Sequence, residues 1–163
     1  MKSLFILLLV LLSLSAVADV AKNVNVEQSY VRSAIQQQRN SAAFMNITNQ
    51  GGQVAIVYAK SPVAKIVELH THIHDNGVMR MRKIEQIDLP TGKVIQLQPG
   101  GLHIMLLGLT RDLMPGDQID VTLGFDDGSE KALKVPVQNM MKQQKKNMKR
   151  HKMDGTMPPM MTH

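Results

Sequence analysis

Residues 118–137 read QIDVTLGFDDGSEKALKVPV, two runs of alternating apolar and polar side chains joined by the turn sequence DDGS. Alternation with a period of two places apolar side chains on one face of a β-strand, whereas an α-helix repeats them about every three or four residues. The stretch therefore predicts a β-hairpin with one face in the core. Pro136 lacks a backbone N–H, so we expect the second arm to lie at the edge of its sheet.

Seven more short apolar stretches precede this hairpin, separated by turns rich in Gly, Pro and Asn. These strand candidates are residues 24–32, 43–47, 54–59, 66–72, 77–84, 94–97 and 102–109. The sequence shows no helical periodicity of useful length and no internal repeat. Many short strands with this punctuation predict an all-β fold, an antiparallel β-sandwich or barrel.

Composition narrows the classes of protein that fit. A length of 163 residues is typical of a single domain. Because only 3% of the residues are aromatic, the core must be filled by Val, Leu, Ile and Ala, and we expect Met45 and Met114 to join it. The sequence contains no cysteine, which excludes a disulfide framework, a thiolate metal site, a cysteine nucleophile and a lipid-modified N-terminal cysteine.

Residues 1–18 have the parts of a secretory signal peptide. Lys2 precedes an apolar run at residues 4–12, about half as long as a membrane-spanning helix, and Ala16-Val17-Ala18 supplies small residues for cleavage. We expect cleavage after Ala18, export to the periplasm and no transmembrane segment in the mature chain. An uncleaved anchor is the alternative.

Residues 138–163 differ in composition from the domain at residues 19–137. They contain no Val, Leu, Ile or aromatic residue, but hold six basic residues against one acidic residue, and seven of the 13 methionines. Such a segment cannot bury enough apolar surface to offset the entropy of ordering it. We therefore expect a disordered tail rich in Met, His and Lys. Export and the lack of aromatic residues among the lysines make nucleic acid a poor partner.

Histidine and methionine recur at strand spacing in the domain. The neutral metal donors with this spacing are His70, His72, His74, Met79, Met81, His103 and Met105. Imidazole and thioether groups without cysteine or carboxylate suit Cu(I), whereas zinc favours added Cys, Asp or Glu, and calcium and magnesium require oxygen. Each methionine taken alone is more often a core residue than a metal ligand, so the combined spacing carries the prediction.

Four of these donors form the pattern H-x10-M-x21-H-x-M, made by His70, Met81, His103 and Met105. This pattern, with its flanking residues 67–70, 77–82 and 99–106, resembles the PCu(A)C family of periplasmic copper chaperones. The resemblance implies a cupredoxin-like Greek-key β-sandwich that binds one Cu(I) through those two histidines and two methionines. It also implies delivery of copper to respiratory oxidases, such as the Cu(A) centre of cytochrome c oxidase.

The resemblance extends to partners. We expect a copper-accepting oxidase subunit, a Sco-type thiol copper protein as a further partner, and a monomeric chain. His72 and His74 are additional to the minimal pattern and leave open whether another imidazole joins or replaces His70. The tail is a second candidate copper site that also suits Cu(II) at its histidines; its donors are Met148, His151, Met153, Met157, Met160, Met161 and His163.

Alternatives to a copper chaperone explain fewer of these sequence features. A periplasmic copper storage, scavenging or resistance protein without an oxidase client is the main alternative. A metalloenzyme would usually add a carboxylate to its histidines, and neither a Ser-His-Asp order nor a pair of catalytic carboxylates can be argued here, so we expect no enzymatic activity. A metal-independent adhesion or scaffolding sandwich would leave the spacing of the histidines without a cause.

Overall fold

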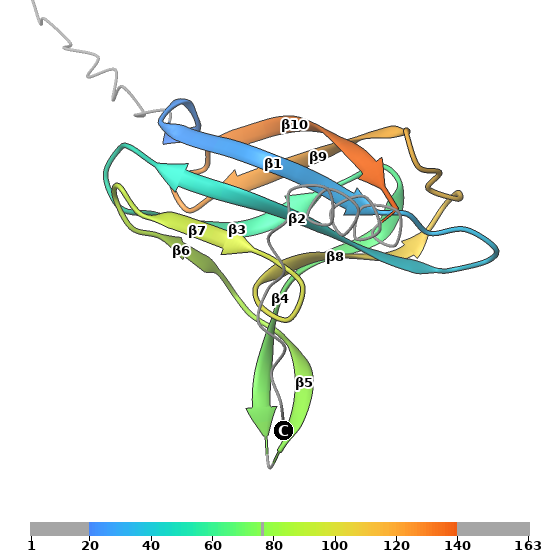
Figure 1. Ribbon diagram of the computed structural model, residues 1–163. Helices are drawn as coiled ribbons and strands as arrows, with labels where there is room; N and C mark the ends of the chain where they lie inside the picture. The colour runs from blue at the N-terminus through green and yellow to red at the C-terminus, as the bar shows by residue number, and fades with distance from the viewer. Residues whose placement is uncertain (1–19, 76, 140–163) are drawn as a thin grey trace, which may run out of the picture.

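The computed structural model describes residues 20–75 and 77–139. This part of the chain forms ten strands and one short 3-10 turn, with no α-helix (Figure 1). In chain order the elements are η1 (Val20–Lys22), β1 (Val24–Arg32), β2 (Asn40–Asn49), β3 (Val54–Lys60), β4 (Ala64–Asp75), β5 (Val78–Lys83), β6 (Ile87–Leu89), β7 (Val94–Leu97), β8 (His103–Leu109), β9 (Gln118–Phe125) and β10 (Glu130–Gln138). The predicted all-β fold is confirmed.

The strands form a β-sandwich whose two layers are joined at one seam. Their order is β5-β4-β8-β2-β1-β10-β9-β3-β6, and β7 also pairs with β2. The seam is the short pairing of β1 with β10, in which Val31 lies beside Val137. This pair is parallel, so the sheet is mixed, although all the other strand pairings are antiparallel among the described residues.

The core fills the space between the layers. Four side chains of the predicted alternation on β9 are each no more than 2% exposed: Ile119, Val121, Leu123 and Phe125. Each buried side chain of this kind contributes about 1.5–3 kcal/mol by leaving water. Met45 is 2% exposed, as predicted. Met114 is 52% exposed, so its predicted core position is wrong.

The exposure of Met114 follows from a turn. Its backbone N–H donates to the Asp117 carboxylate at 3.1 Å, and the Asp117 N–H donates to the Met114 carbonyl at 3.0 Å. The neighbouring Leu113 is fully buried, and adjacent side chains in an extended segment point in opposite directions. Leu113 therefore takes the core position and Met114 faces solvent.

The predicted edge position of β10 is also wrong, since β10 lies between β9 and β1. Val137, and not Pro136, donates to Asp117 of the β9 side at 2.7 Å. Consecutive residues direct their N–H groups to opposite sides, so the nitrogen of Pro136 points away from β9. Pairing with β1 begins only at Val137, and Pro136 therefore removes no ladder hydrogen bond.

A long hairpin made by β4 and β5 projects from the sandwich (Figure 1). Every residue of β5 is exposed, which shows that the hairpin leaves the core. Its register places His70 opposite Lys83, His72 opposite Met81 and His74 opposite Met79. The base of β4 pairs with β8, where His70 lies opposite His103. The hairpin thus carries its histidines and methionines out from the β8 edge of the body.

Candidate metal centre

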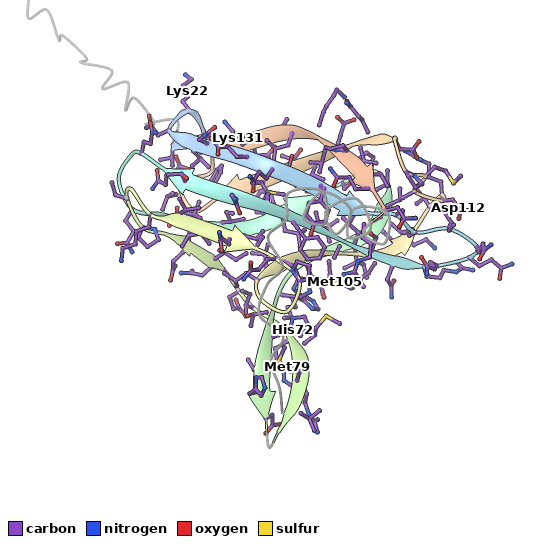
Figure 2. All side chains as sticks on the ribbon, in the orientation of Figure 1. Lys22, His72, Met79, Met105, Asp112 and Lys131 are labelled. Atoms are coloured by element: carbon purple, nitrogen blue, oxygen red, sulfur yellow. The ribbon has the colours of Figure 1, made fainter. Side chains whose placement is uncertain are left out.

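A cavity of about 420 Å³ lies where the β4–β5 hairpin leaves the body. Four lining side chains could bind a metal ion: His72 from β4, Met81 from β5, and His103 and Met105 from β8. Arg32, Phe44, Pro99 and Gly100 complete much of its wall. In Figure 2, His72 and Met105 lie at the junction of hairpin and body, and Met79 lies farther along the hairpin.

Local strand geometry brings these donors together. His103 and Met105 are two residues apart on β8 and therefore share one face. His72 and Met81 are a directly opposed pair across β4 and β5. Side chains of such a pair project from the same face with Cβ atoms about 4.5–5.5 Å apart. Three strands thus supply two imidazoles and two thioethers to one cavity.

The three imidazoles near the cavity form a cluster around His103. The ring centroid of His103 lies 5.7 Å from that of His70 and 5.2 Å from that of His72. The Nδ1–H of His103 donates to the Gly101 carbonyl at 2.9 Å, and Nδ1 of His72 lies 3.4 Å from the same oxygen. Because a carbonyl only accepts, His103 keeps the lone pair on Nε2 for a metal ion.

His103 is held as a neutral ring. It is 2% exposed, and its centroid lies 6.2 Å from that of Phe44. Burial, which disfavours the charged form, is the main reason that the pKa of His103 lies below its ordinary value. Neutral imidazole is the form that binds a metal, so burial keeps the donor ready.

His70 has a different set of contacts. Its Nε2–H donates to Glu68 at 2.9 Å, while Lys83 holds the other Glu68 oxygen at 3.0 Å. The hydrogen bond from His70, followed by that from Lys83, lowers the pKa of Glu68 below its ordinary value. Nδ1 of His70 is buried without a hydrogen-bond partner among the described residues. His70 therefore lies beside the cavity with one unused ring nitrogen, and its role as a copper ligand stays a prediction.

The thioethers divide between wall and surface. Met105 is half-buried on β8, whereas Met81 is 49% exposed on the hairpin. The alternative that Met81 is a core residue is therefore wrong.

The sequence did not predict the contacts of His103 with the Gly101 carbonyl and the Phe44 ring. The signal for the first contact is the pair Gly100-Gly101 shortly before His103, since glycines allow a close approach of the backbone.

The remaining candidates lie elsewhere. His74 is exposed on the hairpin opposite Met79. The tail donors Met148, His151, Met153, Met157, Met160, Met161 and His163 lie outside the described residues. Within residues 20–75 and 77–139, no group of three or more His, Cys, Asp or Glu side chains is arranged to hold a metal ion. In the same ranges, no helix has the length and apolarity to cross a membrane.

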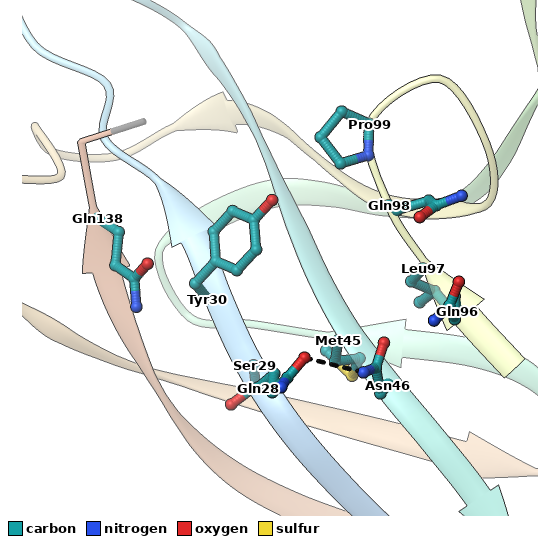
Figure 3. A pocket seen from close by; sticks show the side chains of 10 residues that line it. All are labelled: Gln28, Ser29, Tyr30, Met45, Asn46, Gln96, Leu97, Gln98, Pro99 and Gln138. Atoms are coloured by element: carbon teal, nitrogen blue, oxygen red, sulfur yellow. Dashed lines mark hydrogen bonds between the residues drawn. The ribbon is translucent and has the colours of Figure 1, made fainter. Parts of the chain in front are cut away.

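A second, larger cavity of about 690 Å³ shares Pro99 with the first and has no described lining residue from the β4–β5 hairpin (Figure 3). Its wall carries the amide side chains Gln28, Asn46, Gln96, Gln98 and Gln138. Asn46 donates to Gln28 at 3.0 Å. The described lining contains no histidine, so the smaller cavity is the one that matches the predicted donors.

Comparison with known proteins identifies the family of the chain. The family model described as "Putative lipoprotein LpqE-like" matches residues 24–137. The chain belongs to the LpqE-like family. It is 38% identical over 121 residues to "Putative lipoprotein Lxx21020" of Leifsonia xyli, covering 73% of this chain and 72% of that protein. It is 33% identical over 102 residues to "Uncharacterized protein RP573" of Rickettsia prowazekii, covering 61% and 56%.

The names of several solved structures with a similar fold mention copper. The Cu(I) form of DR1885 from Deinococcus radiodurans has a TM-score of 0.58 at 27% identity, with 77% of this chain and 85% of that chain covered. The copper-bound PCuAC domain from PmoF2 has a TM-score of 0.60 at 19% identity, with 72% and 93% covered, and shows likeness of fold alone. The LpqE-like model belongs to the PCu(A)C family, so the predicted membership of that family is confirmed. The predicted β-sandwich fold is confirmed as well.

Proposed function

We propose that this protein is a periplasmic copper chaperone that holds Cu(I) in the cavity at the base of the β4–β5 hairpin. The observation that carries the proposal is the meeting of Met81, His103 and Met105 with His72 of β4 around one cavity, which has His70 beside it. All these donors are neutral when the histidines are unprotonated, which suits a soft monovalent ion. The copper(I) form of DR1885 is a similar fold that supports the same cargo.

The geometry fits a carrier that releases its ion. Thioethers are weaker donors than thiolates, so a partner's ligands can displace them one at a time. Met81 is 49% exposed and lies on a projecting hairpin, where an incoming ligand can reach the ion. His103 is buried and anchored to Gly101, and keeps its place during exchange. We propose that the recipient is a copper centre of a respiratory oxidase, with a Sco-type protein as a further partner.

The proposal makes the cavity a binding site and not a catalytic one. No step in holding and releasing Cu(I) breaks a covalent bond, and the protein's role is to exclude water and present donors. The predicted signal peptide at residues 1–18 supports the periplasm as the compartment, where cysteine ligands would be lost to disulfide formation. Methionine cannot form disulfides, so its use here fits that compartment.

Replacing a thioether by an alkyl group of similar size tests the proposal. Met81→Leu and Met105→Leu should fold normally, because the volumes match, but should bind Cu(I) about ten-fold more weakly or worse. Met114→Leu is the matched control, since Met114 is 52% exposed and lies outside the cavity. A Cu(I) competition titration gives the affinities. Parental affinity in both cavity variants would overturn the assigned site.

A further inference from the structure

The β4–β5 hairpin carries a second His–Met pair that the cavity does not use. His74 on β4 lies directly opposite Met79 on β5, one step outward from the pair of His72 and Met81. Opposed side chains in an antiparallel pair share a face, with Cβ atoms about 4.5–5.5 Å apart. Each pair therefore presents one imidazole and one thioether on the same face of the hairpin.

The side chain of Met79 reaches toward the cavity. Its Cε atom lies 4.0 Å from the position that a Cβ on Gly100 would occupy. Gly100 lines the cavity together with His72 and Met81. Figure 2 shows Met79 on the hairpin beyond His72. Met79 is thus adjacent to the mouth of the cavity, and His74 lies opposite Met79 in the hairpin.

The two faces of the hairpin differ in chemistry. Arg80 and Arg82 alternate with the methionines and project from the other face, where Arg80 Nε lies 3.6 Å from Asp75 Oδ2. Met79 is 48% exposed, so contact with the core does not hold it in place. Exposed thioethers gain nothing from apolar burial, whereas they bind soft ions well.

We propose that His74 and Met79 form an outer Cu(I) site, through which the ion passes between solvent or partner and the cavity. This inference rests on the proposed function. Successive pairs on one face are about 6.6–6.8 Å apart along the strands. The ion therefore moves by exchanging one neutral donor at a time, stays Cu(I), and transfers no electron or proton. The cavity adds His103 and Met105 to its pair, so affinity rises inward.

A Cu(I) titration of the full chain with 13C-labelled methionine methyl groups tests the outer site. The first equivalent of Cu(I) should shift the Met81 and Met105 signals. Further Cu(I) should shift the Met79 signal, with an affinity at least about ten-fold weaker than that of the cavity. Met114, which is 52% exposed, should not respond. A silent Met79 at every ratio would overturn the outer site. Silent Met81 and Met105 signals would instead overturn the cavity site.

Transfer kinetics test the route. The double variant His74→Gln with Met79→Leu should slow removal of cavity-bound Cu(I) by bathocuproine disulfonate about five-fold, while the cavity affinity changes by less than about two-fold. Met114→Leu should behave like the parent protein. Equal removal rates in parent and double variant would overturn the route, and a parallel loss of affinity would show that both residues belong to the cavity site.

Discussion

His103 connects the fold to the chemistry at the scale of one residue. Its place on β8 buries the ring at 2% exposure, and the Gly101 carbonyl fixes the N–H on Nδ1. Burial lowers the pKa of His103, so the ring remains neutral below the pH at which a free imidazole takes up a proton. The thioethers of Met81 and Met105 do not titrate. Protons therefore compete with Cu(I) only at the histidines.

The sign of the resulting pH dependence can be worked out. Above the ordinary imidazole pKa of about 6.5 the ring is neutral and Cu(I) affinity should be flat. Because burial lowers the pKa of His103, protonation of its Nε2 should weaken Cu(I) binding only at a pH below that at which an ordinary imidazole is protonated. A competition titration from about pH 8 to about pH 5 measures this. A profile that stays flat to the acid end would exclude histidine ligation.

At the scale of the element, periodicity predicts most strands but not every side-chain position. The alternation in residues 118–137 and the candidate at 94–97 match β9, β10 and β7 closely. β6 escapes detection because it has only three residues and ends before Pro90. The sequence also does not predict the side-chain contacts of His70. Its spacing fits a ligand of the cavity, but its Nε2–H donates to Glu68, two residues away. Sequence spacing cannot reveal such a local hydrogen bond.

Gly124 on β9 allows the opposed Tyr58 on β3 to lie across it. A Cβ on Gly124 would overlap the Tyr58 ring, which donates its Oη–H to Glu130 at 2.5 Å. Gly124→Ala should therefore lower the free energy of unfolding by about 1–3 kcal/mol through overcrowding. Gly52→Ala is the control, since no atom lies within 4 Å of its added Cβ, and should change it by less than about 0.5 kcal/mol.

Urea unfolding of both glycine variants provides the free energies. Removing the ring in a second variant, Gly124→Ala with Tyr58→Ala, should recover part of the loss, because the overlap disappears. Equal stability of Gly124→Ala and Gly52→Ala would show that the tyrosine ring does not depend on a glycine beneath it.

At the scale of the whole molecule, the chain divides by composition into a neutral β-domain and a basic methionine-rich tail. The matched family region ends at residue 137, close to the predicted boundary, and β10 ends at Gln138. The Gln138 carbonyl accepts from the Ser33 N–H at 2.9 Å, so the fold includes this residue. The tail's copper role stays a prediction, because its methionines and histidines lie outside the described residues.

Truncation after Asn139 should leave the fold and the cavity affinity intact. Total copper bound should fall, and loading of the cavity at limiting copper should slow, because a tethered set of donors raises the local concentration of the ion. A full-length chain whose tail methionines become leucine keeps the tail charge and is the control. If that control loads like the parent, the tail acts by charge, and its effect should then disappear with added salt.

X-ray absorption of the chain truncated after Asn139, loaded with one equivalent of Cu(I), tests the central claim most directly. The account predicts sulfur from Met81 and Met105 and nitrogen from His103 and a β4 histidine around a single copper ion, with sulfur scattering reduced in Met81→Leu. A copper ion surrounded only by nitrogen or oxygen, or a sulfur signal unchanged in Met81→Leu and Met105→Leu, would contradict it.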